Sequence, residues 1–155
     1  MVRFAKQEDL ERVNELRKQV HAVHAVGRPD IFRENFNEEL RDHVVEYLND
    51  EDKLLIVAER DGVICGFACV TLFDRPQTPA YRERKFLGVE EFGVDEAMRR
   101  QGIGRELFDY IKTDAKVRGF ERIELNMWEF NEGALKFYES VGFKTYRRYM
   151  EFENR

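Results

Sequence analysis

The sequence predicts an α/β domain built on a single mixed β-sheet flanked by helices. Apolar residues recur at intervals of two in some segments, as in strands, and at intervals of three and four in others, as in helices. The segments follow in the order strand, two helices, three strands, helix, strand, helix, strand, which favours helices packed on one sheet. With 155 residues, 43% of them hydrophobic, residues 1–155 are expected to form a single domain around one core.

Composition argues against several function classes. A net charge of −5 argues against a nucleic-acid partner, because such binding depends on an excess of lysine and arginine. No apolar run is long enough for a membrane span, and the first residues turn polar too early for a signal peptide, so a cytoplasmic protein with no membrane contact is expected. Cys65 and Cys69 are expected on the same face of a strand as reduced thiols.

The N-terminal half opens with a strand at residues 1–5. A helix is expected from Glu8 to Val20, because its apolar residues recur at helical spacing and its first turn is acidic. Residues 21–35 are expected to form a loop or a broken helix, since Gly27 and Pro29 interrupt the pattern.

Asn37 is a plausible cap for a second helix. Its expected buried face comprises Leu40, Val44, Tyr47 and Leu48. Residues 53–73 predict a β-hairpin, because two β-branched and aromatic runs flank the turn signal Asp61-Gly62. The polar segment 74–84 is expected to be an exposed loop.

The strand expected from Lys85 to Val94 changes phase in its middle. Leu87 and Val89 follow one alternation and Phe92 and Val94 the other, as a β-bulge would produce. A strong amphipathic helix is expected next, from Gly104 to Lys116, and Gly119 closes it.

The last third of the chain predicts one helix between two strands. A strand is expected at residues 122–128 and a helix at 132–141, ended by Gly142. The alternating run FKTYRRYMEFE, residues 143–153, predicts a final strand.

The segment RRQGIGREL, residues 99–107, has the chemistry of an anion site. It lies where a strand gives way to a helix, so its backbone N–H groups have no partner inside the helix. Gly102 and Gly104 lack side chains that would keep a ligand off the backbone, and the helix dipole attracts negative charge. Three arginines, Arg99, Arg100 and Arg105, are available to surround the anion.

The spacing argues against two other phosphate-binding motifs. A P-loop would need G-x-x-x-x-G-K-S/T, which is absent, and a dinucleotide fingerprint would need glycine where Leu107 stands. The plainer alternative is a tight turn with solvated arginines.

Two separated motifs resemble the GNAT superfamily of N-acetyltransferases. Residues Arg99 to Gly104 match the pattern Q/R-x-x-G-x-G/A, and MWEFNEGALKFYESVGF resembles the segment N-x-x-A-x-x-F-Y-x-x-x-G-F. The elements before them fall in the family's order, so the resemblance covers essentially the whole chain. It implies a GNAT-like fold with a splayed, bulged central strand and an acetyl-CoA-dependent enzyme that acetylates a primary amine of a small molecule or peptide.

The resemblance also implies where acetyl-CoA, the co-substrate, would bind. Phe92, Gly93 and Val94 would hydrogen-bond the pantetheine arm in place of a neighbouring strand. The phosphate-binding set would be Arg99, Arg100, Gln101, Gly102, Ile103, Gly104 and Arg105, with the backbone from Arg100 to Gly104 around the pyrophosphate. Asn131 and Ala134 would complete the site, and Asn131 would also cap the last helix.

Two kinds of catalytic residue are expected. An amine of pKa about 10.4 must lose a proton, so a general base is useful. Glu90 is preferred over Glu91 because it occupies the position of the proposed base in spermidine/spermine-type relatives. The two residues are adjacent, so in an ideal strand only one of them would face the cleft, although a bulge could change which one does. Tyr138 occupies the position of the acid that protonates the leaving thiolate. Transfer would be direct, without a covalent enzyme intermediate.

The segment after the first helix would form a wall of the acceptor site by resemblance. The residues concerned are His21, His24, Arg28, Asp30 and Phe32. No metal is expected, because His21 and His24 have no third ligand at a recognised spacing. A homodimer is expected to be possible, since relatives often pair their final strands.

Two rival functions stay open at this point. A catalytically silent acyl-CoA-binding or regulatory module would keep the cofactor corner without acceptor chemistry. A nucleotide-dependent enzyme would bind ATP or NAD more tightly than acetyl-CoA.

Overall fold

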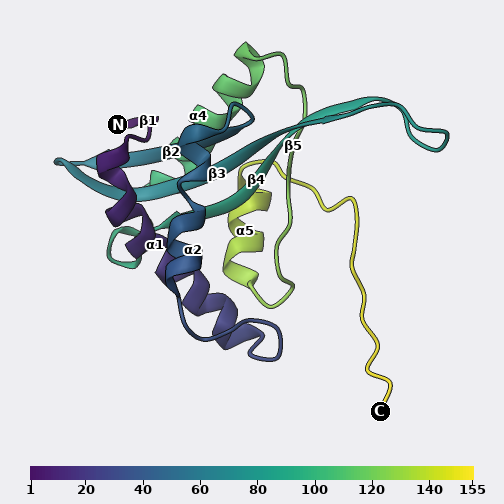
Figure 1. Cartoon of the computed structure of the whole chain (residues 1–155), viewed down its shortest axis with the longest axis horizontal. Helices are drawn as coiled ribbons and strands as arrows, with labels where there is room; N and C mark the ends of the chain where they lie inside the picture. Colours follow the sequence, from purple (N-terminus) through teal and green to yellow (C-terminus); the bar gives the residue numbers. More distant parts are fainter.

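The structure is a computed structural model that describes residues 1–155, and one five-stranded mixed sheet organises it (Figure 1). The strands lie in the order β1-β2-β3-β4-β5, antiparallel except for the parallel pair β4 and β5. Their bounds are β1 Val2–Phe4, β2 Lys53–Arg60, β3 Val63–Arg75, β4 Arg84–Val94 and β5 Ile123–Leu125. The predicted fold class is confirmed.

Helices cover both faces of the sheet. The chain contains α1 Leu10–Gly27, α2 Glu38–His43, α3 Glu46–Asn49, α4 Ile103–Val117 and α5 Glu132–Ser140, with short 3-10 turns at Gln7–Asp9 and Glu96–Met98. The buried face of α4 packs on one side of the sheet through Leu107 and Ile111. On the other side, Val13 and Leu16 of α1 pack against Phe67 of β3. No helix combines the length and apolar character that a membrane span needs.

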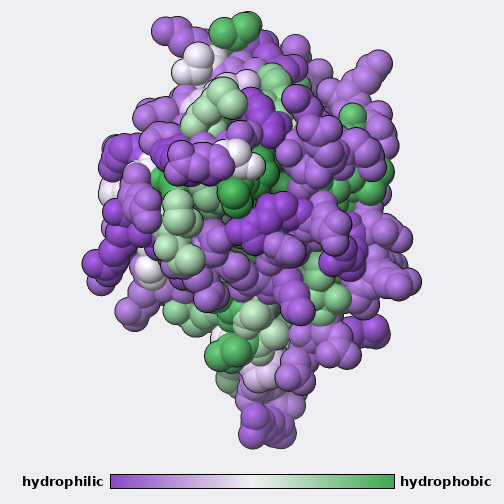
Figure 2. Space-filling view, turned by 90° about the vertical axis from the view of Figure 1, so that its left-hand side faces the viewer, coloured by the Kyte–Doolittle hydropathy of each residue, from purple (hydrophilic) through white to green (hydrophobic).

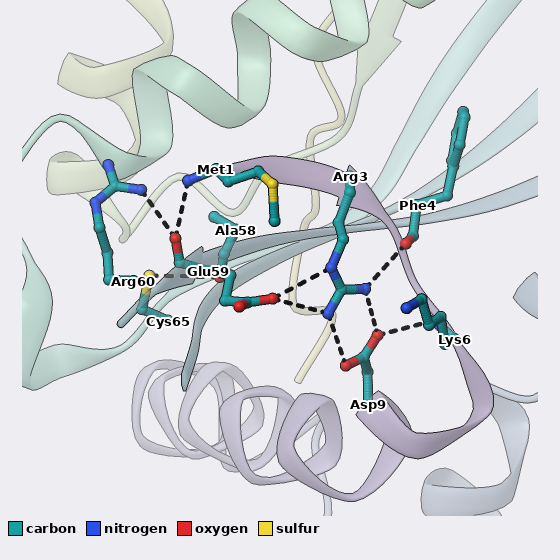
Figure 3. A network of polar contacts seen from close by, with 9 residues as sticks. All are labelled: Met1, Arg3, Phe4, Lys6, Asp9, Ala58, Glu59, Arg60 and Cys65. Atoms are coloured by element: carbon teal, nitrogen blue, oxygen red, sulfur yellow. Dashed lines mark hydrogen bonds and ion pairs between the residues drawn. The ribbon is translucent and has the colours of Figure 1, made fainter. Parts of the chain in front are cut away.

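A polar network joins β1 to the start of α1 and to β2 (Figure 3). The Arg3 guanidinium donates to both carboxylate oxygens of Asp9, at 2.7 and 3.1 Å, and to Glu59. Asp9 is buried, and the hydrogen bond from Arg3 lowers its pKa. The Asp9 carboxylate also accepts from the Lys6 N–H, which fixes the turn into α1.

Helix α1 is longer than predicted. It runs without a break to Gly27, so the expectation of a loop or broken helix from residue 21 is wrong for residues 21–27. Histidine, alanine and valine are tolerated in a helix, and the residue before a proline is the first one driven from helical geometry. Arg28, which precedes Pro29, is that residue, with φ −138° and ψ 70°.

The next elements follow the predictions closely. The Asn37 side chain accepts a hydrogen bond from the Leu40 N–H at 2.9 Å, which confirms the cap, although the helix is split into α2 and α3. Asp61 and Gly62 form the hairpin turn with φ of 51° and 78°. The strands β3 and β4 continue past the expected ends, and their joined tip extends beyond the rest of the sheet (Figure 1).

The two cysteines lie on opposite faces of the sheet. Ala58 of β2 faces Gly66 while Glu59 faces Ile64, so Cys65 is an extra, unpaired residue of β3. This bulge turns Cys65 toward α4, whereas Cys69 faces α1. The expectation of a shared face is therefore wrong, and both thiols are free and buried.

The final predicted strand is absent. Residues 143–153 form no strand, and β5 is shorter than the expected segment 122–128. The C-terminal segment instead runs away from the body of the molecule (Figure 1). An alternating pattern forms a strand only where its backbone pairs with a neighbouring strand, and the backbone of residues 144–153 makes no such hydrogen bond.

Figure 2 shows the face at the β1 and β2 side of the sheet. It is largely hydrophilic, with apolar atoms in small separate patches. This face therefore offers no large apolar surface.

Candidate active site

A bulge in β4 separates it from β5. Cys69 of β3 faces Glu91 and the next residue, Val70, faces Val89, so Glu90 is an extra residue with no partner in β3. β4 pairs with β5 only from Leu87 to Val89. The two strands part at the bulge, and the edge of β4 beyond it has no neighbouring strand. The phase change in the sequence is thus confirmed as a bulge.

The bulge places both carboxylates on the face of the sheet that carries α1 and α3. Glu91 binds Arg17 of α1, and a Cβ on Gly88 would lie 3.6 Å from Oε1 of Glu90. Burial raises the pKa of Tyr47 in α3 to about 12, and both glutamates add to that shift. The expectation that only one of the two would face the cleft is therefore wrong, because the extra residue cancels the alternation.

The two carboxylates differ in what they bind. Arg17 donates from Nε to Oε2 of Glu91 at 2.7 Å and from Nη2 to Oε1 at 3.1 Å. The Arg17 side chain is only 1% exposed and also donates to Asn14 and to the Leu40 carbonyl. Glu90 is exposed, and no protein group donates to its carboxylate. Glu91 is therefore a structural anion, and Glu90 is the free carboxylate.

The N-terminus of α4 presents unpaired amides. The first intrahelical bond is from the Glu106 N–H to the Gly102 carbonyl, so the preceding amides at Ile103, Gly104 and Arg105 have no partner in the helix. Gly102 has φ 81°, and a Cβ there would meet nothing within 4 Å. Arg100 adopts the same left-handed region, with φ 64°. The loop thus turns its backbone outward into open space.

Charged side chains surround these amides. Arg99, Arg100, Gln101 and Arg105 are exposed, and the three arginines form no ion pair. Arg99 is near the β4 edge, since its Nε lies 3.4 Å from the Val94 carbonyl oxygen. Their free guanidinium groups and the helix N-terminus make the corner attractive to an anion.

Gly104 has a packing role that the sequence did not indicate. A Cβ at this position would lie 3.0 Å from the ring of Phe137 in α5. The ring of Phe137 stacks on Phe92 of β4, with centroids 5.6 Å apart. The missing side chain of Gly104 therefore makes room for α5 beside α4.

Asn131 begins α5 and borders an open hollow. Its side chain accepts from the Ala134 N–H at 3.1 Å, as a helix cap does. The hollow has a volume of about 400 Å³ and lies between Asn131 and Phe130 on one side and α1 and Glu96 on the other. Asn131 thus borders this hollow, whereas Ala134 lies within α5 and is not part of its lining.

Tyr138 of α5 packs within an aromatic group. Its ring lies 6.1 Å from Phe92 and 5.5 Å from Phe143, measured between centroids. Burial raises the pKa of Tyr138 to about 12, so the phenol keeps its proton at neutral pH. The hydroxyl donates to no protein acceptor, which leaves it available.

The expected acceptor-side residues come together at the end of α1. The His24 ring stacks on Phe32 at 5.1 Å, and His21 lies 6.1 Å from the same ring. Burial lowers the pKa of His24, with a contribution from His21, so its imidazole stays neutral. Arg28 is engaged elsewhere, because it pairs with Asp30 and with Glu151 of the C-terminal segment. No group of three or more His, Cys, Asp or Glu side chains is placed to hold a metal ion.

Two residues of this region were not predicted from the sequence. Arg17 binds Glu91, and Asn14 accepts a hydrogen bond from Arg17 at 2.8 Å. Trp128, whose ring lies 5.2 Å from that of Phe32, belongs to the same aromatic group. The sequence did contain an indication that Arg17 is buried, because a residue four positions after Val13 lies on the same, buried face of the helix. The ion pair between Arg28 and Glu151 joins residues that are far apart in the sequence, and no sequence pattern indicated it.

A family model and curated relatives match the chain. The model described as "Acetyltransferase (GNAT) family" matches residues 27–143. The L-ornithine N5-acetyltransferase NATA1 of Arabidopsis thaliana is 28% identical over 100 residues, which are 64% of this chain and 42% of that protein. The chain thus spans less than half the length of that relative.

Solved structures match along the whole chain. A mutant of the BH1408 protein from Bacillus halodurans is 30% identical, with a TM-score of 0.96 over 100% of this chain and 99% of that one. AAC(6′)-Iy in complex with the bisubstrate analogue CoA-S-monomethyl-acetylneamine is 18% identical, with a TM-score of 0.78 over 100% and 97% of the two chains. At that identity the likeness concerns the fold.

Proposed function

The chain belongs to the GNAT acetyltransferase family, and we propose that residues 1–155 act as one acetyl-CoA-dependent N-acetyltransferase domain. The observation that carries the proposal is the parting of β4 and β5 at Glu90, next to the open N-terminus of α4. A slot between strands and an anion site at its end are what a long thioester with a pyrophosphate requires.

The cofactor-holding residues follow from this geometry. The amides from Arg100 to Arg105 would bind the pyrophosphate, with the unpaired arginines around it. The free edge of β4 at Phe92, Gly93 and Val94 would hydrogen-bond the pantetheine arm as a missing strand would. An N–H group of the same edge would donate to the oxyanion that develops on the acetyl carbonyl.

Glu90 is the proposed general base. A primary amine of pKa about 10.4 is mostly protonated at pH 7, and removing that proton costs roughly 4.6 kcal/mol. The Glu90 carboxylate would take the proton as the amine nitrogen forms its bond to the acetyl carbon. Glu91, with both oxygens bound to Arg17, is the less suitable of the two.

Tyr138 is the proposed general acid. As the bond from the acetyl carbon to sulfur breaks, the CoA thiolate needs a proton or a hydrogen bond. The Tyr138 phenol keeps its proton because burial raises its pKa to about 12, and it has no competing protein acceptor. Transfer would be direct from thioester to amine, and neither cysteine takes part, since both are buried.

The acceptor would enter beside the aromatic wall of His21, His24 and Phe32. Its class is a primary amine on a small molecule or peptide, which fits the relative named an L-ornithine acetyltransferase. Use of acetyl-CoA and the two free thiols are in keeping with a cytoplasmic site of action.

Release of CoA thiol with different acceptors tests the proposal. The panel comprises polyamines, aminoglycosides, amino acids and peptide N-termini, with acetyl-CoA as donor. Acceptor-dependent release supports the enzyme. Binding of acetyl-CoA without turnover on any acceptor would instead support a silent acyl-CoA-binding module, and tighter binding of ATP or NAD would favour a nucleotide-dependent enzyme.

A further inference from the structure

Arg17 of α1 is a buried cation with several hydrogen-bond partners. Its side chain is 1% exposed, and its guanidinium donates four hydrogen bonds. Two go to the oxygens of Glu91, at 2.7 and 3.1 Å, one to the Asn14 side chain at 2.8 Å and one to the Leu40 carbonyl at 2.6 Å. A buried charge is costly unless its hydrogen bonds are made, so these partners fix the guanidinium in one position.

The carboxylate that Arg17 binds belongs to the bulge of β4. Glu91 faces Cys69 of β3, and the Cys69 thiol donates to Oε2 of Glu91 at 3.4 Å. Groups from α1 and from β3 therefore hold this carboxylate together. Glu90 is the extra residue directly before Glu91, so the position of its backbone depends on how Glu91 is held.

The same guanidinium also contacts the acceptor side. Leu40 lies in α2, and the ring of Phe36, just before that helix, is centred 5.4 Å from Cζ of Arg17. Phe36 in turn lies 6.0 Å from His21, measured between ring centroids, and His21 is part of the aromatic wall. Arg17 thus joins the strand that carries Glu90 to the elements beside the proposed acceptor site.

We propose that Arg17 is a positioning residue, which sets the distance between Glu90 and the acceptor amine by holding the β4 bulge against α1 and α2. The inference rests on the proposed function, because Arg17 would act only through Glu90 as the base. Proton transfer needs the carboxylate within hydrogen-bond distance of the amine, and a misplacement of about 1 Å can lower a rate by about 10²-fold. Arg17 itself has no part in the chemistry, since its donors bind Glu91, Asn14 and Leu40.

A double-mutant cycle separates this role from a purely structural one. The variants are Arg17→Met, Glu90→Gln and the two changes combined. Methionine keeps much of the length of the arginine side chain and removes all of its donors. The measurement is kcat from CoA thiol release at pH 7, with acetyl-CoA and the best acceptor of the panel both saturating, together with the Tm of each variant.

The expected result is that the two changes are not independent. In the unaltered chain, Arg17→Met should lower kcat by about tenfold or more. In the Glu90→Gln background, the same change should lower kcat by no more than about twofold, because the carboxylate that Arg17 positions is already gone. A purely structural role would give the same fold-loss in both backgrounds.

Two further variants serve as controls. Arg3→Met removes another guanidinium that binds both oxygens of a carboxylate, on β1, the edge strand away from β4. It should lower the Tm and leave kcat unchanged. Arg17→Lys keeps the charge but loses the fork geometry, so it should lower kcat less than Arg17→Met does. If Arg17→Met does not fold, Arg17→Lys takes its place in the cycle.

The outcomes distinguish this inference from the proposed function. Equal fold-losses in both backgrounds, or an Arg17→Met protein with the kcat of the unaltered chain, would overturn the positioning role and leave Glu90 as the base. A kcat that Glu90→Gln alone leaves unchanged would overturn Glu90 as the base and the role of Arg17 with it. Absence of thiol release with every acceptor would overturn the proposed enzymatic function itself, and the positioning role as well.

Discussion

Replacement of Glu90 by glutamine should lower the rate in a pH-dependent way. The change keeps the size of the side chain and removes an exposed carboxylate that no protein group binds. A general base contributes about 10²-fold to 10⁴-fold, so at pH 7 the turnover of Glu90→Gln should fall by about 10²-fold or more. The deficit should shrink as the pH rises toward the amine pKa of about 10.4, because the amine then loses its proton without help.

The matched control is Glu91→Gln, one residue away on the same face. This change leaves the Arg17 guanidinium, which is 1% exposed, without its anion. The expected cost is about 1–3 kcal/mol of folding free energy, or a fall in Tm on the order of 5 °C. Its turnover should vary with pH as in the unaltered protein.

The assay is CoA thiol release at saturating acetyl-CoA from pH 6 to pH 10, combined with thermal unfolding of each variant. A deficit of Glu90→Gln that stays constant across this range would refute its role as the base. A pH-dependent deficit in Glu91→Gln with unchanged Tm would move that role to Glu91.

The remaining predictions concern the acid, the anion corner and the N-terminal network. Tyr138→Phe should lower kcat by about 10²-fold while acetyl-CoA affinity, measured by calorimetry, stays nearly unchanged; an unaltered kcat would remove Tyr138 as the acid. Gly102→Val forces a β-branched residue to φ 81° in the anion corner and should weaken acetyl-CoA binding. Its control, Gly62→Val, has a similar φ of 78° in the distant hairpin turn; it should lower the stability by a similar amount and leave acetyl-CoA affinity unchanged. Asp9→Asn should destabilise the protein by about 1–3 kcal/mol at pH 7 by removing the charge that binds Arg3. Because the pKa of Asp9 is lowered in the folded state, its contribution to stability is present above about pH 3.9 and is lost as the pH falls through the folded-state pKa. Denaturant titrations should therefore show the unfolding free energies of the two proteins converging in acid. A difference in unfolding free energy that stays constant with pH would contradict this.

Most helices and strands could be predicted from the sequence because turns, caps and hydrophobic periodicity depend on residues close together in the chain. The Asp61-Gly62 turn and the Asn37 cap each depend on a few adjacent residues, and both formed as expected. The phase change before Val94 located the bulge. The end of α1 was misjudged because Gly27 ends a helix as easily as it breaks one.

The features that the sequence could not supply depend on distant partners. The bulge at Cys65 is visible only in the pairing of β3 with β2, and because of it the prediction that both cysteines share a face of the sheet is wrong. The bulge at Glu90 put both glutamates on one face, and only the fold shows that Arg17 engages one of them. The prediction of a final strand was wrong because a strand must pair with the edge of another strand, and an alternating sequence pattern alone does not provide that pairing.

The central claim is that the amides at the start of α4 bind the pyrophosphate of coenzyme A. Titration of ¹⁵N-labelled protein with acetyl-CoA, followed by amide NMR, tests it most directly. The expected result is that the largest shifts fall on Gln101 to Arg105, followed by the free β4 edge at Phe92 to Val94. Saturable binding that leaves the amides of Ile103, Gly104 and Arg105 unshifted would contradict the account.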